Sequence, residues 1–152
     1  MVIWNIQLTT KKRVAMKKET FLREFMAEIW NKKRFERVEH YVHKHYTIHL
    51  DTSDPWEGKT LDHAEFKVRL NFSFDSFPDM HFEITSAIED ENQVAITWIL
   101  TGTNLGKIGE YPPTKKAINT KGMTIYHFKD DLICGHTQVF DRTTVMKQLG
   151  FI

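Results

Sequence analysis

A long predicted hairpin near the end of the chain constrains the fold more than any other feature of the sequence. One strand is predicted from about Ala117 to Phe128 and a second from Leu132 to Asp141. The polar turn Lys129-Asp130-Asp131 joins them, as is typical of an antiparallel hairpin. A hairpin of this length is stable only when further strands or helices cover its apolar face, so the preceding residues are expected to shelter it.

The second strand of the hairpin carries polar side chains among apolar ones. Because side chains alternate across a strand, one face is expected to hold Cys134, His136, Gln138 and Phe140. The opposite face is expected to hold Ile133, Thr137 and Val139. The first face places an imidazole beside an amide, which predicts the floor of a small-molecule pocket.

The composition favours one globular domain with a substantial core. The chain has 152 residues, of which 41% are hydrophobic and 27% are charged. Its formal net charge of +1 creates no overall field that would attract nucleic acid or an anionic membrane. No stretch reaches the ~18 consecutive apolar residues of a membrane span. We therefore expect neither a nucleic-acid partner nor a membrane partner.

The single cysteine, Cys134, excludes a disulfide within the chain and fits a reducing compartment, so a cytoplasmic location is expected. Residues 1–15 are expected to form an extension outside the fold. Their apolar residues precede their basic ones, the reverse of a secretory signal, and Met16 is an alternative translation start. The domain is therefore predicted to span residues 16–152.

Three helical segments are predicted before the main run of strands. Apolar residues recur at helical spacing from Lys17 to about Asn31, and a shorter stripe runs from Phe35 to Tyr41. A third helix begins after Asp62, whose side chain is expected to form a capping box with Glu65. The Phe77-Pro78 pair ends this helix, because proline disfavours helical geometry in the residue before it.

The chain beyond the third helix alternates as strands do. The segment His81–Ile88 is expected to place Phe82, Ile84 and Ile88 on one face. The segment Val94–Thr101 is expected to place Val94, Ile96, Trp98 and Leu100 on one face. Helices followed by antiparallel strands predict an α+β fold, with the N-terminal helices packed on the concave face of a curved sheet.

Four histidines crowd the segment after the second helical stripe, namely His40, His43, His45 and His49. No cysteine or carboxylate lies at metal-ligand spacing from them, so no metal site is predicted. The sequence also lacks a nucleotide or phosphate-binding motif, and we expect no cofactor. His49 lies in a predicted strand from Tyr46 to Leu50. It is either a solvent-facing residue or a second proton carrier in the pocket.

Several short motifs, taken in order along residues 16–152, resemble those of one family. They are Trp30-Asn31-Lys32, Tyr46-Thr47-Ile48-His49, Phe77-Pro78-Asp79-Met80, Trp98-Ile99-Leu100-Thr101-Gly102-Thr103, Tyr111-Pro112-Pro113-Thr114, Phe140-Asp141-Arg142 and Gln148-Leu149-Gly150. In this order they resemble the SnoaL-like polyketide cyclases, often labelled ester cyclases. The resemblance implies a cone-shaped α+β barrel of the nuclear transport factor two-like superfamily, and it implies dimerisation through the outer face of the sheet.

The resemblance also implies a catalytic pattern on the last long strand. It implies that cyclases of this family carry a His, an aromatic residue and an Asp in succession on this strand. The Asp acts there as general acid and base. The matching residues here are His136, Thr137 and Gln138, so an amide replaces the acid. A primary amide cannot titrate, although Gln138 can still donate a hydrogen bond to a carbonyl oxygen.

Three functions remain open from the sequence. The first is a cofactor-free cyclase, isomerase or lyase in which His136 is the base, Gln138 polarises a carbonyl and His49 is a second proton carrier. The second is a non-catalytic module that binds an apolar small molecule in the same pocket. The third is a dimeric interaction domain. The residues expected to line the pocket are Trp30, Trp56, Phe66, Trp98, Tyr126 and Phe140.

Overall fold

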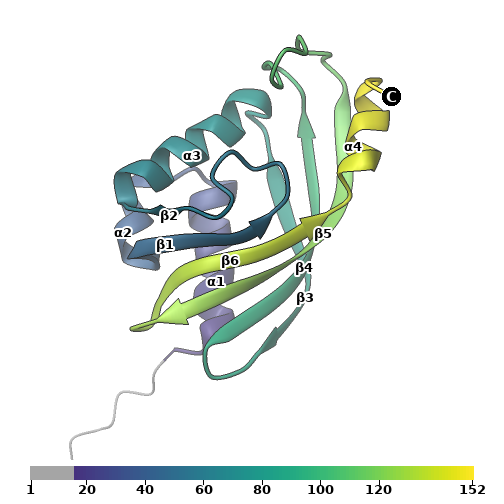
Figure 1. The fold of residues 1–152 in the computed structure, drawn as a ribbon. Helices are drawn as coiled ribbons and strands as arrows, with labels where there is room; N and C mark the ends of the chain where they lie inside the picture. The colour runs from purple at the N-terminus through teal and green to yellow at the C-terminus, as the bar shows by residue number, and fades with distance from the viewer. Residues whose placement is uncertain (1–15) are drawn as a thin grey trace, which may run out of the picture.

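The computed structural model describes residues 16–152, and the predicted extension at residues 1–15 lies outside the described residues. Helical segments come first, followed by a long strand and a very short one, a long helix, four further long strands and a final helix (Figure 1). The strands form one curved, open sheet (Figure 1). Helix α1 packs against strands β3 and β4 of that sheet. The α+β fold expected from the sequence is therefore confirmed.

The first helix is regular for two turns and then widens. Helix α1 (Lys18–Phe25) continues as a π-helical segment (Met26–Asn31), and a short 3-10 turn (Phe35–Arg37) leads into α2 (Val38–Tyr41). The face turned to the sheet carries the buried side chains Leu22, Phe25, Met26, Ile29 and Trp30. Among the described residues no helix is long and apolar enough to cross a membrane.

Each of the two later helices is capped at its N-terminus by an aspartate. Helix α3 (His63–Ser76) starts with the predicted capping box, because Asp62 accepts a hydrogen bond from the backbone N–H of Glu65 at 2.8 Å while Glu65 accepts one from that of Asp62 at 2.9 Å. Helix α4 (Arg142–Leu149) is capped by Asp141, which accepts from the backbone N–H of Thr144 at 2.9 Å.

The sheet has six strands in the order β2-β1-β6-β5-β4-β3. The strands are β1 (Val42–Asp51), β2 (Thr60–Leu61), β3 (His81–Glu89), β4 (Gln93–Thr103), β5 (Ala117–Lys129) and β6 (Leu132–Phe140). The predicted hairpin is β5–β6 and is antiparallel. One pair departs from the expected antiparallel sheet, because β1 and β6 run parallel. A parallel neighbour is possible here since the whole of α3 and β3–β5 lies between the two strands.

Register shifts in β1, β3 and β6 bend the sheet and change which side chains face inward. In β3 the register shifts between Ile84 and Ser86, so Ile88 turns outward and is 76% exposed, whereas the plain alternation predicted it beside Ile84. In β6 the register shifts at Cys134, so Ile133 is fully buried and Cys134 is half-buried. The two faces expected for these β6 residues are therefore wrong. Of the two shifts in β1, the one between Ile48 and Leu50 is decisive for the site.

A glycine in the middle of β5 makes room for the indole ring of Trp98. Gly122 lies directly opposite Trp98 of β4, and a Cβ atom there would approach the Trp98 ring to 2.3 Å and Phe140 Cβ to 2.6 Å. We expect Gly122→Ala to lower the free energy of unfolding by about 1–3 kcal/mol, because the Trp98 ring and the backbone that carries Phe140 would have to shift to admit the methyl group. Urea denaturation measures this value.

The matched control for that variant is Gly102→Ala in β4. A Cβ atom at Gly102 would find its nearest neighbour at 3.5 Å, which is ordinary van der Waals contact. Its effect is expected to stay within about 1 kcal/mol. Equal losses for the two variants would show that the Gly122 contact is not a tight one.

Candidate functional site in the inner cavity

A cavity of about 680 Å³ opens between the concave face of the sheet and the helices. Its deeper wall is largely aromatic and apolar, and includes Trp30, Met80, Phe82, Trp98, Leu100, Ile118, Tyr126 and Phe140. Its polar wall is formed by Tyr46, Asp51, Asp54, Arg69, His136, Gln138 and Arg142. This volume suits a ligand of drug-like size, and a mainly apolar lining with a few convergent polar groups is typical of small-molecule sites.

The structure brings together most of the pocket residues expected from the sequence. His136, Gln138, Trp30, Trp98, Tyr126 and Phe140 all lie in the lining. Two expected members lie elsewhere. Phe66 packs behind the wall against Tyr46, with ring centroids 4.8 Å apart, and Trp56 packs against Phe72 at 5.3 Å. Both act as packing residues for the wall instead of contacting the cavity.

His49 lies on the other side of the sheet from His136. Its ring packs against His127 on the outer face, with centroids 4.9 Å apart. The register explains this position, because Ile48 pairs with His136 and Leu50 pairs with Thr137, which leaves His49 as the extra residue of a bulge. His49 therefore does not meet His136 in the cavity, contrary to its expected role as a second proton carrier.

The same bulge turns Asp51 inward and creates a feature that the sequence pattern did not predict. Plain alternation from Ile48 would send the side chain of Asp51 to the outer face, but after the bulge Asp51 pairs with Gln138 and shares its face. Asp51 is only 2% exposed. Its Oδ2 atom accepts hydrogen bonds from His136 Nε2 and from Gln138 Nε2, each at 3.1 Å. A carboxylate thus joins the two polar residues of β6.

Two arginines balance the charge of this buried carboxylate. Arg69 of α3 donates from Nη2 to Asp51 Oδ2 at 3.1 Å, and Arg142 donates to Asp51 Oδ1 at 2.8 Å. Arg69 also donates from Nε to Asp54 at 2.9 Å. The side chains of Arg69 and Asp51 are almost fully buried, whereas that of Arg142 is 37% exposed. A buried charge without such partners would be strongly destabilising, so this network is a structural requirement of the site.

The environment keeps Asp51 ionised and His136 neutral. Burial alone would raise the pKa of Asp51, but the hydrogen bond from His136 and the charges of Arg69 and Arg142 hold that pKa below its usual range. Burial lowers the pKa of His136, opposed by its hydrogen bond to Asp51, and Arg69 lowers it further. At neutral pH the imidazole is therefore an uncharged base.

The hydrogen bonds also determine which nitrogen of His136 carries the proton. A carboxylate can only accept, so Nε2 donates to Asp51 and Nδ1 is left as an acceptor. The hydroxyl of Tyr46 lies 2.6 Å from Nδ1 and donates to it. Burial raises the pKa of Tyr46 well above its ordinary value, so the phenol stays protonated. Tyr46, His136 and Asp51 therefore form one ordered row of hydrogen bonds.

A second row of hydrogen bonds fixes the orientation of the Gln138 side-chain amide. Trp98 Nε1 donates to Thr124 Oγ1 at 2.8 Å, and the Thr124 hydroxyl donates to Gln138 Oε1 at 2.7 Å. This places the amide nitrogen of Gln138 toward Asp51, to which it donates one of its two protons. The second N–H has no partner among the described residues and is available to a ligand oxygen.

Trp30 contributes a further donor to the apolar wall. The π-helical segment that carries it is a feature often found at functional sites. Its indole nitrogen is buried and has no hydrogen-bond partner within residues 16–152. Buried donors are normally paired, so this nitrogen is an exception that carries a desolvation cost. No group of three or more His, Cys, Asp or Glu side chains suited to a metal ion occurs among these residues.

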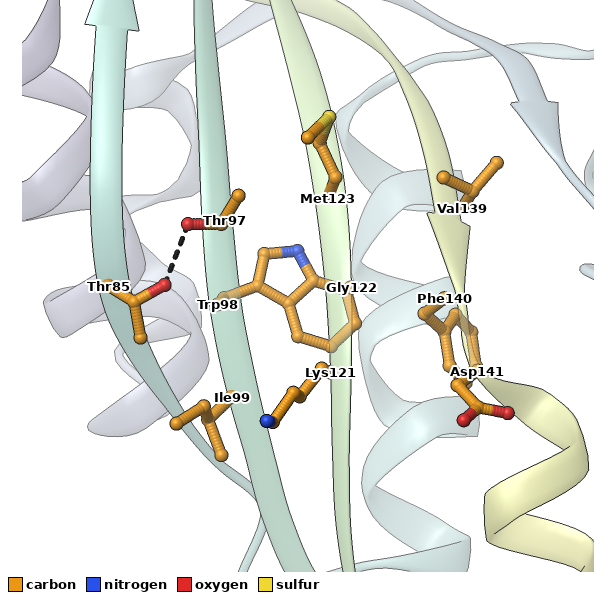
Figure 2. Close-up of a pocket in the computed structure, with 10 residues that line it drawn as sticks. All are labelled: Thr85, Thr97, Trp98, Ile99, Lys121, Gly122, Met123, Val139, Phe140 and Asp141. Atoms are coloured by element: carbon orange, nitrogen blue, oxygen red, sulfur yellow. Dashed lines mark hydrogen bonds between the residues drawn. The ribbon is translucent and has the colours of Figure 1, made fainter.

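The outer face of the sheet has a shallow hollow of its own, of about 570 Å³ (Figure 2). Met123 and Val139 stand side by side on β5 and β6 there, and Thr85 and Thr97 share a hydrogen bond of 2.7 Å on the neighbouring strands (Figure 2). It contains none of the Tyr46, His136 and Asp51 row. The polar network therefore belongs to the inner cavity alone.

Similar proteins indicate which family the chain belongs to. The family model of the SnoaL-like polyketide cyclases matches residues 20–149. A candidate polyketide cyclase from Acidithiobacillus ferrooxidans is 35% identical and superposes with a TM-score of 0.82, over 90% of this chain and 96% of that one. IdmH, a candidate polyketide cyclase from Streptomyces antibioticus, is 20% identical with a TM-score of 0.74, over 89% and 99% of the two chains. No curated protein matches. The chain belongs to the SnoaL-like polyketide cyclase family.

Proposed function

We propose that this protein catalyses acid–base chemistry on a small carbonyl compound held in the inner cavity, as a cyclase, isomerase or lyase would. The observation that carries the proposal is the buried pair of His136 and Asp51 in the wall of an aromatic cavity, with 3.1 Å between Nε2 and Oδ2. A neutral imidazole whose pKa lies near or below neutrality is a suitable general base at pH 7.

His136 would take a proton from the carbon next to a carbonyl group. Its Nδ1 atom is reached through the Tyr46 hydroxyl, which accepts the substrate proton as it passes its own to Nδ1. The imidazolium formed in this way is stabilised by Asp51, in the manner of other carboxylate-supported histidines. The free N–H of Gln138 would stabilise the enolate oxygen.

Ring closure would then follow without any other reactant. The enolate carbon attacks a second carbonyl carbon of the same molecule, one carbon–carbon bond forms, and the new alkoxide receives the proton held by His136. The product is an isomer of the substrate. The carboxylate that the family resemblance implies at Gln138 is, in this proposal, supplied by Asp51 from the neighbouring strand.

The simplest test of this proposal is proton exchange at a ketone. 2-Tetralone is a flat bicyclic ketone that fits an aromatic cavity of this size, and its exchange in deuterated water is followed by proton NMR. Wild-type protein is expected to accelerate the exchange at the carbon between ring and carbonyl. Saturable binding of 2-tetralone without any acceleration would contradict catalysis.

A second function, binding without turnover, is favoured by one specific observation. Asp51 Oδ2 already accepts three hydrogen bonds, from His136, Gln138 and Arg69, so this buried carboxylate is satisfied without a ligand. In a binding module these groups would only orient an apolar ligand. The exchange experiment separates the two functions, since a module returns its ligand unchanged and with its original protons.

We also propose that the protein forms a homodimer through the outer face of the sheet. Met123 and Val139 are 46% and 57% exposed there, and Lys121 and Asp141 flank them (Figure 2). A two-fold axis through this patch would let the lysine of one copy face the aspartate of the other. Sedimentation at micromolar concentration is expected to show a dimer, and Met123→Glu is expected to give a monomer. A monomeric wild-type protein would refute the proposal.

A further inference from the structure

We propose that the mouth of the inner cavity is a subsite for a carboxylate group of the ligand, bound by Arg142 and Lys107. This inference specifies the ligand class of the proposed function and rests on the same cavity. Both side chains belong to the cavity lining, Arg142 at the start of α4 and Lys107 in the loop between β4 and β5.

Arg142 is held in place but retains most of its hydrogen-bonding capacity. Its guanidinium lies 4.1 Å above the ring of Phe140, and one nitrogen, Nη2, donates to Asp51 at 2.8 Å. A guanidinium has five N–H donors. Its Nε and Nη1 atoms make no hydrogen bond within residues 16–152, and the side chain is 37% exposed. A planar, pre-oriented guanidinium of this kind suits a carboxylate, which it can bind through two parallel hydrogen bonds.

The charges around the cavity leave one positive charge in excess. Asp51 and Asp54 are neutralised by Arg69 and Arg142 at distances of 2.8 to 3.1 Å. Because His136 is neutral at pH 7, Lys107 is the remaining charge of the lining. Glu57 accepts a hydrogen bond from the backbone N–H of Asp51 at 2.7 Å, but it lies outside the lining. An anionic group at the mouth would compensate the excess charge.

The deeper wall selects the rest of the ligand. Trp30, Phe82, Trp98 and Phe140 form a continuous run of rings with neighbouring centroids 5.1 to 5.8 Å apart. A flat aromatic body would pack against these rings while a carboxylate stays beside the cations. The ligand class is therefore an aromatic or polycyclic carbonyl compound that carries a carboxylate.

The test compares two probes with the same naphthalene ring, one a carboxylate and the other its uncharged methyl ester. Binding of 2-naphthoate and of methyl 2-naphthoate is measured by isothermal titration calorimetry at pH 7.5 and low salt. We expect the acid to bind about tenfold more tightly than the ester, and we expect this preference to shrink as salt is added. Lys107→Gln should reduce the preference to about threefold or less, while affinity for the ester stays within about twofold. Arg142→Gln should reduce the preference likewise, although it also removes a partner of Asp51.

The matched control is Lys44→Gln, which removes an exposed lysine of β1 that does not line the cavity. It should keep the full preference for the acid. Equal binding of acid and ester, an unchanged preference in both mouth variants, or no binding of either probe would overturn the proposal. A preference for the acid without acceleration of 2-tetralone exchange would retain the subsite and reject catalysis, so the two failures are distinguishable.

Discussion

Asp51→Asn is expected to lower the free energy of unfolding by about 3–5 kcal/mol, because it breaks the buried ion network at its centre. The amide removes the charge that faces Arg69 and Arg142 and leaves Arg69, whose side chain is only 7% exposed, with Asp54 as its remaining anion. It also replaces the acceptor of His136 Nε2. Urea denaturation at pH 7 measures the loss.

Asp75→Asn is the matched control for this variant, because Asp75 is an exposed carboxylate of α3. Its effect should stay within about 0.5 kcal/mol. A double-mutant cycle that combines Asp51→Asn with Arg69→Met isolates the coupling between the two buried charges. If Asp51→Asn lost less than about 1 kcal/mol, the ion network would not be a structural requirement of the site.

The pH dependence of stability has the same origin. The pKa of Asp51 is lower in the folded chain than in the unfolded one, so its contribution is present above the unfolded value of about 4 and is lost as pH falls through the folded pKa. The pKa of His136 is also lowered, and folding is therefore weakened as pH falls below about 6.5. Both groups make the wild-type protein less stable in acid.

His136→Gln is expected to reduce the protein-catalysed exchange of 2-tetralone by about 10²- to 10⁴-fold. Glutamine can still donate a hydrogen bond to Asp51, but it cannot take a proton at pH 7. The wild-type rate should fall on the acid side as His136 becomes protonated, at a pH below the ordinary histidine value because its pKa is lowered. Exchange rates measured by NMR from pH 5 to pH 8 test both the loss and its pH dependence.

His49→Gln distinguishes between the two roles that the sequence left open for His49, a residue facing solvent and a second proton carrier in the pocket. His49 packs on His127 at the outer face, away from the cavity, so its removal should leave the exchange rate within about twofold of wild type. If His49→Gln and His136→Gln reduced the exchange rate equally, the assignment of the reaction to the inner cavity would be contradicted. An unchanged rate for His136→Gln would reject His136 as the base.

The elements of the fold were predictable from local patterns in the sequence. The β5–β6 hairpin, the amphipathic first helix and the capping box of Asp62 each have signals within a few residues, namely alternation, helical spacing and a pair of caps. The apolar alternation of β4 was also sufficient to predict which of its side chains enter the core. These features depend on neighbours in the chain and little on the rest of the molecule.

The central carboxylate was not predictable in the same way. Asp51 faces inward only because β1 bulges at His49, and a single extra residue reverses the alternation of every side chain after it. No glycine or proline marks this bulge. Ile88 in β3 and Cys134 in β6 were assigned to the wrong faces for the same reason. Sequence alternation predicts strands well, but it predicts faces only up to the first bulge.

Long-range partners formed the other part of the site that local patterns could not supply. Arg69 comes from α3, Tyr46 from β1 and Arg142 from α4, and each reaches the network across 18 to 91 residues of chain. Trp56 and Phe66 show the converse case. Both were expected to line the pocket, but each packs behind the cavity wall against another aromatic ring. Only the assembled sheet and helices decide which of these side chains meet.

The most direct test of the central claim is the protonation state of His136, measured by two-dimensional nitrogen-15 NMR on protein labelled at histidine. We predict a neutral ring at pH 7 that carries its proton on Nε2, donated to Asp51, with Nδ1 unprotonated and facing Tyr46. The ring is also expected to titrate below the ordinary histidine value, because its pKa is lowered by burial. A charged imidazolium at pH 7, or a neutral ring protonated on Nδ1, would contradict the assignment of His136 as the base.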